Sequence, residues 1–249
     1  CNGGYVNLSG ATQGNVTFRN FVINGGASST ATMHINAVSS SQPCTIDGVL
    51  VVLSHGRTSM TGINAGYDVT IKNTVVLVYG TDPVTPTGIF GGNSTVYVDN
   101  CTVVCLDSIT GSVGIQGHGG AGLRVRNTYV GGFATDYTGT FAASGNVGNA
   151  SSGTGTPENN TGLESIALST TNFENVTTST EDLRVKSTSA LATTGAARLA
   201  TVLTDVFGVS RQDPTTVGAF EALAGGGSST TPLIGGLTHG ILTKGRLVA

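Results

Sequence analysis

Apolar and polar residues alternate in five short segments of the chain, and all five follow the same eight-residue phrase. The first and third positions are apolar, the fourth is charged, and the fifth is Asn or Gly. The segments cover 16–23, 44–51, 69–76, 96–103 and 123–130. Their fifth residues are Asn20, Gly48, Asn73, Asn100 and Asn127, which gives steps of 28, 25, 27 and 27 residues. Strict alternation predicts short β-strands, and a fixed period of this length is typical of one coil of a parallel β-solenoid.

A second column of isoleucines supports the same period independently. These residues follow the first four fifth-position residues by 15, 15, 16 and 15 positions, at Ile35, Ile63, Ile89 and Ile115. The sequence therefore predicts an all-β fold, a parallel β-helix with coils of about 25–28 residues.

The alternation changes phase at the fifth residue of each phrase. Apolar residues lie four and two positions before it, but one and three positions after it. Since successive strand residues point to opposite faces, this change requires one bent residue between two strands. Asn and Gly tolerate left-handed backbone angles best. Stacked coils are therefore expected to form a corner ladder of Asn side chains that bond from rung to rung.

The charged residue before each bend alternates in sign along the chain, in the order Arg19, Asp47, Lys72, Asp99 and Arg126. Parallel strands lie about 4.8 Å apart, so these side chains are expected to form an outward ladder of ion pairs. An exposed pair contributes only about 0.2–1 kcal/mol, which favours a role in strand register.

The composition limits the classes of function. The 249 residues include 38 Gly and no Trp, and only 10% are charged, which favours tight coils over a helical protein. The net charge is −3 and no basic cluster with aromatic residues is present, so nucleic acid is not an expected partner. No apolar run is long enough to span a membrane, and no signal segment opens the chain. The first residue is Cys1, which processing or an origin inside a longer protein would explain.

The cysteines are expected to be free, buried thiols. Cys101 and Cys105 fall on the same inward face of one strand, about 13 Å apart, which is too far for a disulfide. Cys44 points inward two coils away. No spacing typical of a metal site is present, so neither a metal nor a cofactor is expected.

The regular coils are predicted to end near Phe141, which lies 14 residues after Asn127 and is assigned to the isoleucine column. A surface loop is expected over 143–160 and a further strand pair over 163–176. We divide the chain into a β-helix over 1–223 with irregular closing coils from about 143, a flexible Gly/Ser-rich linker over 224–231, and a hydrophobic tail over 232–249.

The segment Asp205-Val-Phe-Gly-Val-Ser-Arg211, followed by Val217-Gly-Ala-Phe-Glu221, resembles the D-x-x-G-x-x-R … (D)IGAFE end of many right-handed parallel β-helix proteins. The pectate-lyase-like superfamily contains such proteins. Val217 replaces the usual Ile, and no Asp precedes it. The resemblance implies a right-handed β-helix whose closing coil covers the open end of the stack. Members include bacterial surface proteins, carbohydrate-active enzymes and phage virion proteins, so it implies little about function.

The tail is apolar, yet it is too short to form its own core. We expect it to add strands to a neighbouring subunit or partner, and the alternative is that it folds back on its own helix. The expected docking residues are Pro232, Leu233, Ile234, Leu237, Ile241, Leu242, Leu247 and Val248.

Candidate active-site residues lack suitable neighbours in the sequence. Gly117-His118-Gly119 resembles a segment of polygalacturonases, but the nearest acids are Asp99, assigned to the ladder, and the lone Asp107. A calcium-dependent lyase needs several acids on one face. The remaining candidates are isolated or occupy different offsets, namely Asp68, Asp82, Asp136, His34, His55 and His239. We assign no catalytic residue and no metal ligand.

These observations favour a non-enzymatic structural protein of a virion or an extracellular surface, such as a capsid decoration protein or a fibre. It would assemble through its tail as a homo-oligomer, with a trimer as one form, on a capsid or surface protein. One alternative is a polysaccharide lyase or glycoside hydrolase of the same superfamily. The other is a glycan-binding adhesin.

Overall fold

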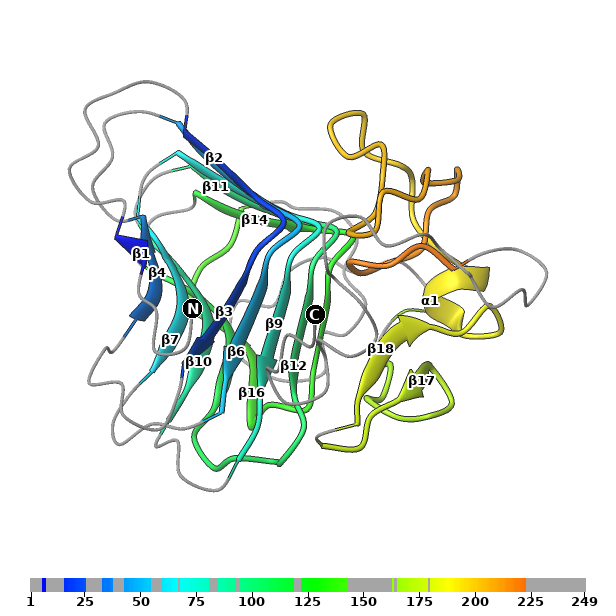
Figure 1. The fold of residues 1–249 in the computed structure, drawn as a ribbon, viewed down its shortest axis with the longest axis horizontal. Helices are drawn as coiled ribbons and strands as arrows, with labels where there is room; N and C mark the ends of the chain where they lie inside the picture. Colours follow the sequence, from blue (N-terminus) through cyan, green and yellow to red (C-terminus); the bar gives the residue numbers. More distant parts are fainter. Residues whose placement is uncertain are drawn as a thin grey trace, which may run out of the picture.

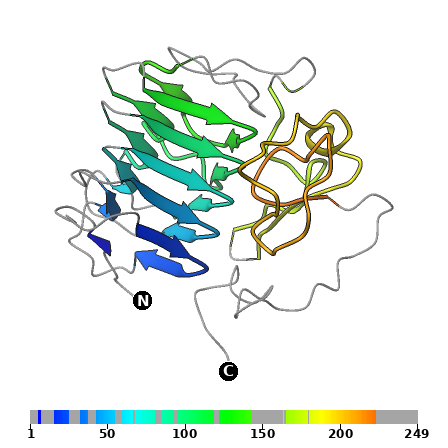
Figure 2. The same cartoon turned by 90° about the horizontal axis from the view of Figure 1, so that it is seen from above.

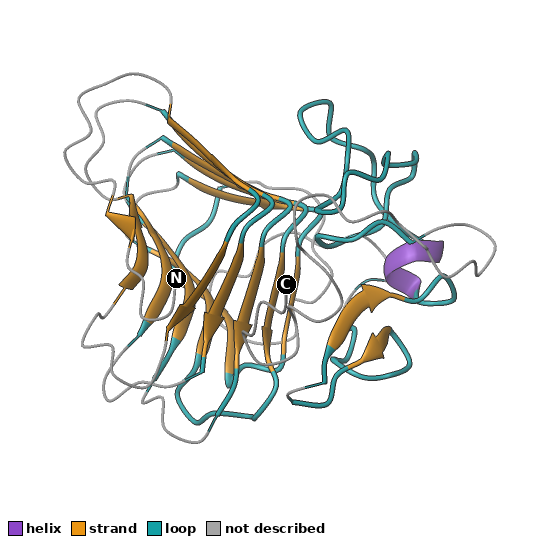
Figure 3. Ribbon diagram, in the orientation of Figure 1, coloured by secondary structure: helices purple, strands orange, loops and turns teal. Residues whose placement is uncertain are grey.

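The structure is a computed structural model that describes residues 6–7, 16–25, 33–37, 43–54, 60–66, 68–80, 85–92, 95–118, 122–142, 163, 165–178 and 180–222. Strands and turns dominate, as Figure 3 shows, and the one helix in these described ranges, α1 (Ala190–Thr193), is short. No helix within these ranges is long and apolar enough to cross a membrane.

Three parallel sheets form the walls of a solenoid (Figure 1). The first contains β2 (Val16–Arg19), β5 (Cys44–Asp47), β8 (Val69–Lys72), β11 (Val96–Asp99) and β14 (Leu123–Arg126). The second contains β3 (Val22–Gly25), β6 (Leu50–Leu53), β9 (Val75–Val78), β12 (Thr102–Cys105) and β15 (Tyr129–Gly131). The third contains β1 (Val6–Asn7), β4 (Met33–Ala37), β7 (Thr61–Ala65), β10 (Thr87–Gly91), β13 (Val113–Gly117) and β16 (Thr135–Thr138).

The register aligns equivalent phrase positions in successive coils, which Figure 2 shows stacked in chain order. In the first sheet, Val16 lies beside Cys44, Cys44 beside Val69, and Val69 beside Val96. Ile63 and Ile89 are likewise neighbours in the third sheet. The predicted all-β solenoid of stacked parallel coils is therefore confirmed.

The bend between the first and second sheets is also confirmed. The five fifth-position residues all have positive φ, at 54° for Asn20, 66° for Gly48, 49° for Asn73, 48° for Asn100 and 49° for Asn127. This left-handed residue reverses the alternation of faces, so apolar residues on both sides of it point inward.

The interior of the solenoid is a column of small aliphatic side chains. The first and third phrase positions of the second to fifth coils are at most 3% exposed. A fully buried Val, Leu or Ile contributes about 1.5–3 kcal/mol. The core of the coils is thus supplied by the same residues that define the repeat.

The second sheet is buried on its outer face as well. Outward residues such as Leu50, Val75 and Tyr129 pack against a C-terminal layer, which we define as residues 163–222. This layer contains β17 (Phe173–Asn175), β18 (Asp182–Val185) and α1, and it lies along the side of the stack in Figures 1 and 2. The expectation that this segment covers the end of the stack is wrong, because the apolar outer face of the second sheet is what it buries.

Two local assignments also need correction. The strand pair expected over 163–176 is the antiparallel pair of β17 and β18, with Phe173 opposite Val185. In the fifth coil, Tyr137 rather than Phe141 occupies the isoleucine column, because it pairs with Ile115. A short turn between β15 and β16 brings Tyr137 into this place, and the Phe141 ring packs edge-on against it at 5.8 Å.

Candidate functional site

The charged corner where the first sheet turns into the second contains the predicted ladder. Asp47 Oδ2 lies 3.2 Å from Arg19 Nε and 3.7 Å from Lys72 Nζ. Asp99 accepts two hydrogen bonds from Arg126, at 2.7 and 2.6 Å. These contacts join neighbouring coils and confirm the predicted pairing of alternating charges at three of the four steps; no ion pair joins Lys72 and Asp99 among the described residues.

The Asp99–Arg126 pair differs from the weak, exposed pair that the sequence suggests. Asp99 is only 1% exposed, and the Arg126 guanidinium also lies 4.9 Å from the centre of the Tyr97 ring. Burial raises the pKa of Asp99, while the hydrogen bonds from Arg126 oppose that rise. A pair of this kind is costly to break, since removing one partner leaves a buried charge.

The Asn side chains at the corner do not form the expected rung-to-rung ladder among the described residues. Asn73 Nδ2 donates to Asp47 Oδ1 at 3.2 Å, and Asn127 Nδ2 donates to the carbonyl oxygen of Ala197 at 2.9 Å. The buried amide of Asn100 has no hydrogen-bond partner in the described part of the chain. The corner amides therefore bond to the acid ladder and to the C-terminal layer.

A buried cluster, which we call the clamp, fixes the C-terminal layer at this corner. It consists of Asp205, Arg211 and Glu221. Arg211 Nη1 lies 3.2 Å from Glu221 Oε2, and the two side chains are 0% and 2% exposed. Arg211 Nη2 donates to Asn73 Oδ1 at 3.0 Å and to the carbonyl oxygen of Gly218 at 3.0 Å. Burial lowers the pKa of Arg211, and the nearby carboxylates of Glu221 and Asp205 oppose that shift.

Asp205 organises the loop on the other side of the clamp. Its Oδ1 accepts from the backbone N–H groups of Phe207 and Val209, both at 2.8 Å, and its Oδ2 accepts from Glu221 N at 3.0 Å. Burial raises the pKa of Asp205, and these hydrogen bonds oppose the rise. Gly208 has a φ of 83° in this turn. The Asp, Gly, Arg and Glu of the recognised motif thus serve to fold and dock the layer.

The GAFE part of the motif contacts the coils directly. Ala219 N donates to Thr102 Oγ1 at 2.9 Å, and Gly218 N donates to the carbonyl oxygen of Asn127 at 2.9 Å. Gly218 has a φ of 114°, and an added Cβ would lie 2.9 Å from Thr102 Oγ1. The sequence identifies these residues as a closing motif, but nothing in the sequence marks Thr102 and Asn127 as the coil residues that bind them.

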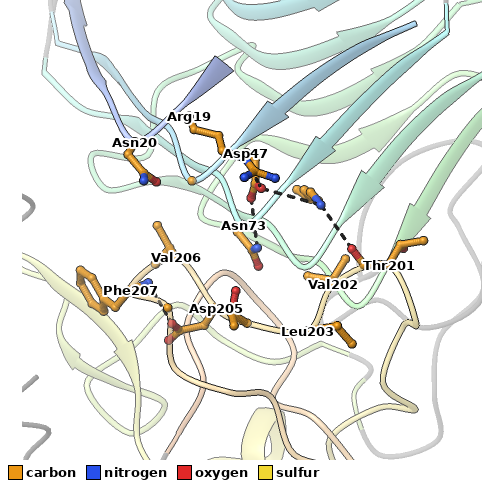
Figure 4. Close-up of a pocket in the computed structure, with 14 residues that line it drawn as sticks. Arg19, Asn20, Asp47, Asn73, Thr201, Val202, Leu203, Asp205, Val206 and Phe207 are labelled. Atoms are coloured by element: carbon orange, nitrogen blue, oxygen red, sulfur yellow. Dashed lines mark hydrogen bonds and ion pairs between the residues drawn. The ribbon is translucent and has the colours of Figure 1, made fainter. Parts of the chain in front are cut away.

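A pocket of about 310 Å³ lies between the charged corner and the loop at 201–208 (Figure 4). It is lined by Arg19, Asn20, Asp47, Gly48, Lys72, Asn73, Thr201, Val202, Leu203, Thr204, Asp205, Val206, Phe207 and Gly208. We call it the corner pocket. Lys72 Nζ donates to the carbonyl oxygen of Thr201 at 3.2 Å and so ties the two sides together. Arg19 and Leu203 are more open, with exposed fractions of 62% for the Arg19 side chain and 58% for Leu203.

Both carboxylates that line the corner pocket are engaged in structural contacts. Asp47 contacts Arg19, Lys72 and Asn73, while Asp205 accepts three backbone hydrogen bonds. The pocket therefore offers the exposed Arg19 side chain and apolar side chains to a ligand, rather than a carboxyl group placed for proton transfer.

The sequence-level active-site candidates are distributed over separate places. His118 is exposed, and its backbone N–H donates to the carbonyl oxygen of Gly91 at 2.9 Å. The centre of its ring lies 5.7 Å from that of Phe90. Asp107 accepts from Gly80 N at 2.6 Å and from Thr178 Oγ1 at 2.7 Å. Asp68 is exposed and Asp136 is buried. Within the ranges the structure describes, no three His, Cys, Asp or Glu residues are grouped to hold a metal ion.

The prediction of free, buried thiols is confirmed for Cys44, Cys101 and Cys105. Burial raises the pKa of Cys44 to about 11 and that of Cys101 further. The Cys101 thiol donates to the carbonyl oxygen of Asp99 at 3.3 Å.

Several predicted elements lie outside the described residues. They are Cys1, Asp82, His55, the loop at 143–160, the linker at 224–231, and the tail at 232–249 with all eight of its docking residues.

Comparisons with protein-family models, with curated proteins and with solved structures found no match.

Proposed function

We propose that this chain is a non-enzymatic structural protein of a virion or an extracellular surface, assembled through the tail at 232–249. The observation that carries the proposal is that structural contacts engage both carboxylates of the corner pocket. A glycosidase needs carboxyl groups that exchange protons with sugar and water. Asp47 and Asp205 are instead engaged by ion pairs and backbone N–H groups.

The construction of the molecule supports the same proposal. Parallel coils bury an aliphatic interior, and the clamp fastens a second layer along the side of the stack. We expect such a scaffold to resist local opening and proteolysis, because strands that pack on a buried core open only at a high cost in free energy. The resemblance of the 205–221 segment to the end of pectate-lyase-like β-helices, which include virion and surface proteins, supports this class.

Glycan binding by an adhesin is a second candidate, favoured by one observation. Tyr97 is half-buried on the outer face of the first sheet, and its ring lies 5.8 Å from the Arg124 guanidinium and 4.9 Å from that of Arg126. An aromatic face beside cations suits a sugar that carries an acidic group. A polysaccharide lyase or hydrolase remains the alternative for an enzyme.

The test compares the intact chain with a chain that ends after Leu223, which keeps the clamp and the Ala222 N–H bond to Thr216. Static light scattering gives the assembly state, and circular dichroism reports folding. We expect the intact chain to form a defined oligomer and the shortened chain to be a folded monomer. An intact chain with Leu237→Asp and Ile241→Asp should also be monomeric.

Two results would overturn the proposal. One is an identical assembly state for the intact and shortened chains. The other is cleavage of a polysaccharide from a panel of acidic and neutral glycans, which would establish an enzyme instead.

A further inference from the structure

The loop that forms one wall of the corner pocket is held in place by backbone hydrogen bonds. The carbonyl oxygen of Leu203 accepts from Arg211 N at 2.9 Å, and Val206 N donates to the carbonyl oxygen of Ala219 at 3.0 Å. The pocket is therefore formed before any ligand binds, as most small-molecule sites are. Its volume of about 310 Å³ lies at the lower end of the range for ligand pockets, which favours a small occupant.

Arg19 is the cation of the corner pocket that keeps hydrogen-bonding capacity for a ligand. Its Nε lies 3.2 Å from Asp47 Oδ2, and its side chain is 62% exposed. The guanidinium makes no other ion pair or hydrogen bond in the described part of the chain, so the N–H groups on both Nη atoms are available. A guanidinium fork of this kind binds a carboxylate through two parallel hydrogen bonds.

Lys72 does not supply a second available cation. Its Nζ lies 3.7 Å from Asp47 Oδ2 and donates to the carbonyl oxygen of Thr201 at 3.2 Å. The two cations that line the pocket, Arg19 and Lys72, are balanced by the two acids, Asp47 and Asp205. A balanced pocket with one available fork suits a group with a single negative charge, such as a carboxylate, better than a phosphate.

The wall across from Arg19 is apolar. Leu203, which is 58% exposed, is the one exposed large hydrophobic residue among those that the structure describes. Val206 and Phe207 also line the pocket, and both are half-buried. Figure 4 shows these two residues on the other side of the pocket from Arg19 and Asp47. An apolar group placed against this wall would remove its surface from water, which is favourable.

We propose that the corner pocket binds a small monocarboxylate with an apolar body, such as an arylalkanoate. The carboxylate accepts two hydrogen bonds from the Arg19 guanidinium, and the apolar body lies against Leu203, Val206 and Phe207. The residues that line the pocket belong to the coils and to the C-terminal layer. The site is therefore separate from the tail and does not depend on the proposed function.

The test titrates the full, isotope-labelled chain with two ligands and follows its amide signals by NMR. Hydrocinnamate carries the carboxylate, and hydrocinnamamide has nearly the same shape without the charge. Both are added to the natural chain and to three variants. Arg19→Gln removes the fork and Leu203→Ser removes an apolar side chain, and both residues are exposed, so the fold should be kept. Arg124→Gln is the control, since it changes an exposed arginine of β14.

We expect hydrocinnamate to shift the amide signals of residues 201–208 with a dissociation constant of about 1 mM or below. Hydrocinnamamide should bind about tenfold more weakly, because it lacks the charge-assisted hydrogen bonds. This difference should disappear with Arg19→Gln and persist with Arg124→Gln. Leu203→Ser should weaken both ligands about threefold, because less apolar surface is buried.

The assignment fails if millimolar hydrocinnamate leaves the signals of residues 201–208 unchanged, or if the acid and the amide bind equally. It also fails if the preference for the acid survives Arg19→Gln, or if Leu203→Ser has no effect on either ligand. Tighter binding of the dipeptide N-acetyl-glutamyl-phenylalanine amide than of hydrocinnamate would assign the pocket to a peptide segment instead of a small acid.

Discussion

Replacing Arg211 by Met is the most informative single perturbation of this molecule. Both the Arg211 and Glu221 side chains are almost fully buried, and the guanidinium donates to three side chains and three carbonyl groups. Met fills a similar space but leaves the Glu221 charge without its cation. Removing one partner of a buried ion pair costs about 3–5 kcal/mol. That loss is a large fraction of a typical folding stability of about 5–15 kcal/mol.

The loss should be concentrated in the C-terminal layer. Arg211 donates a hydrogen bond to the coils at Asn73, and the sheet pairings themselves do not include it. Urea unfolding followed by circular dichroism gives the free energy of unfolding, and hydrogen exchange locates the loss. Amides of β17, β18 and the 205–221 segment should exchange faster, while those of β8 and β11 should keep most of their protection.

Two control variants test whether the loss comes from the buried charge of the clamp. Arg124→Met changes an exposed arginine and should alter the free energy of unfolding by less than about 0.5 kcal/mol. Adding Glu221→Gln to Arg211→Met should recover part of the loss, because no charge then stays buried alone, and the coupling should exceed about 1 kcal/mol. A loss below about 1 kcal/mol for Arg211→Met, or protection lost equally in all coils, would refute the role given to the clamp.

Three further predictions concern the coils. Asn73→Gly should cost about 2 kcal/mol in urea unfolding because it removes bonds to Asp47 and Arg211, whereas Asn100→Gly should be nearly neutral; equal losses would contradict the assignment of these amides. Gly48→Ala should lower the free energy of unfolding by about 1–2 kcal/mol, because the φ of Gly48 is +66° and a methyl group would lie 2.7 Å from Asn20 Oδ1. Gly48→Asn should lower it less, because Asn tolerates a left-handed backbone better than Ala. Stability should fall above pH 9, because the Cys44 thiol ionises near 9.0 when unfolded but near 11 when folded, so the folded chain holds more protons in that window. Cys44 should account for about 2 kcal/mol of this fall by pH 11, so the fall should be smaller in Cys44→Ala; an unchanged alkaline slope in that variant would contradict the prediction.

The coils could be predicted from the sequence because their chemistry is local. The change of phase and the left-handed bend at Asn20 lie within one eight-residue phrase, and the alternating charges follow from repeating that phrase along the chain. The isoleucine column was predicted correctly for Ile63 and Ile89, and it was wrong at Phe141, where a shorter turn altered the spacing.

The outer face of the second sheet has a signal of its own in the sequence, outside the repeated phrase positions. Residues 50–53 read Leu-Val-Val-Leu and residues 75–78 read Val-Val-Leu-Val, without a polar residue at the outward positions. Uninterrupted apolar strands indicate burial on both faces. This pattern predicts that another element packs on the outer face of the second sheet. The C-terminal layer does so, since Phe173 and Leu183 lie in the same buried cluster as Val52 and Leu77.

The clamp could not be placed from sequence because its decisive contact joins residues far apart in the chain. Asn73 is chosen by the local need for a left-handed bend, and Arg211 belongs to a motif 138 positions later. The Asn73 amide nevertheless donates to Asp47 of the ladder and accepts from Arg211 of the clamp. The charge ladder, the bend and the docked layer therefore share one side chain, and that side chain also lines the corner pocket.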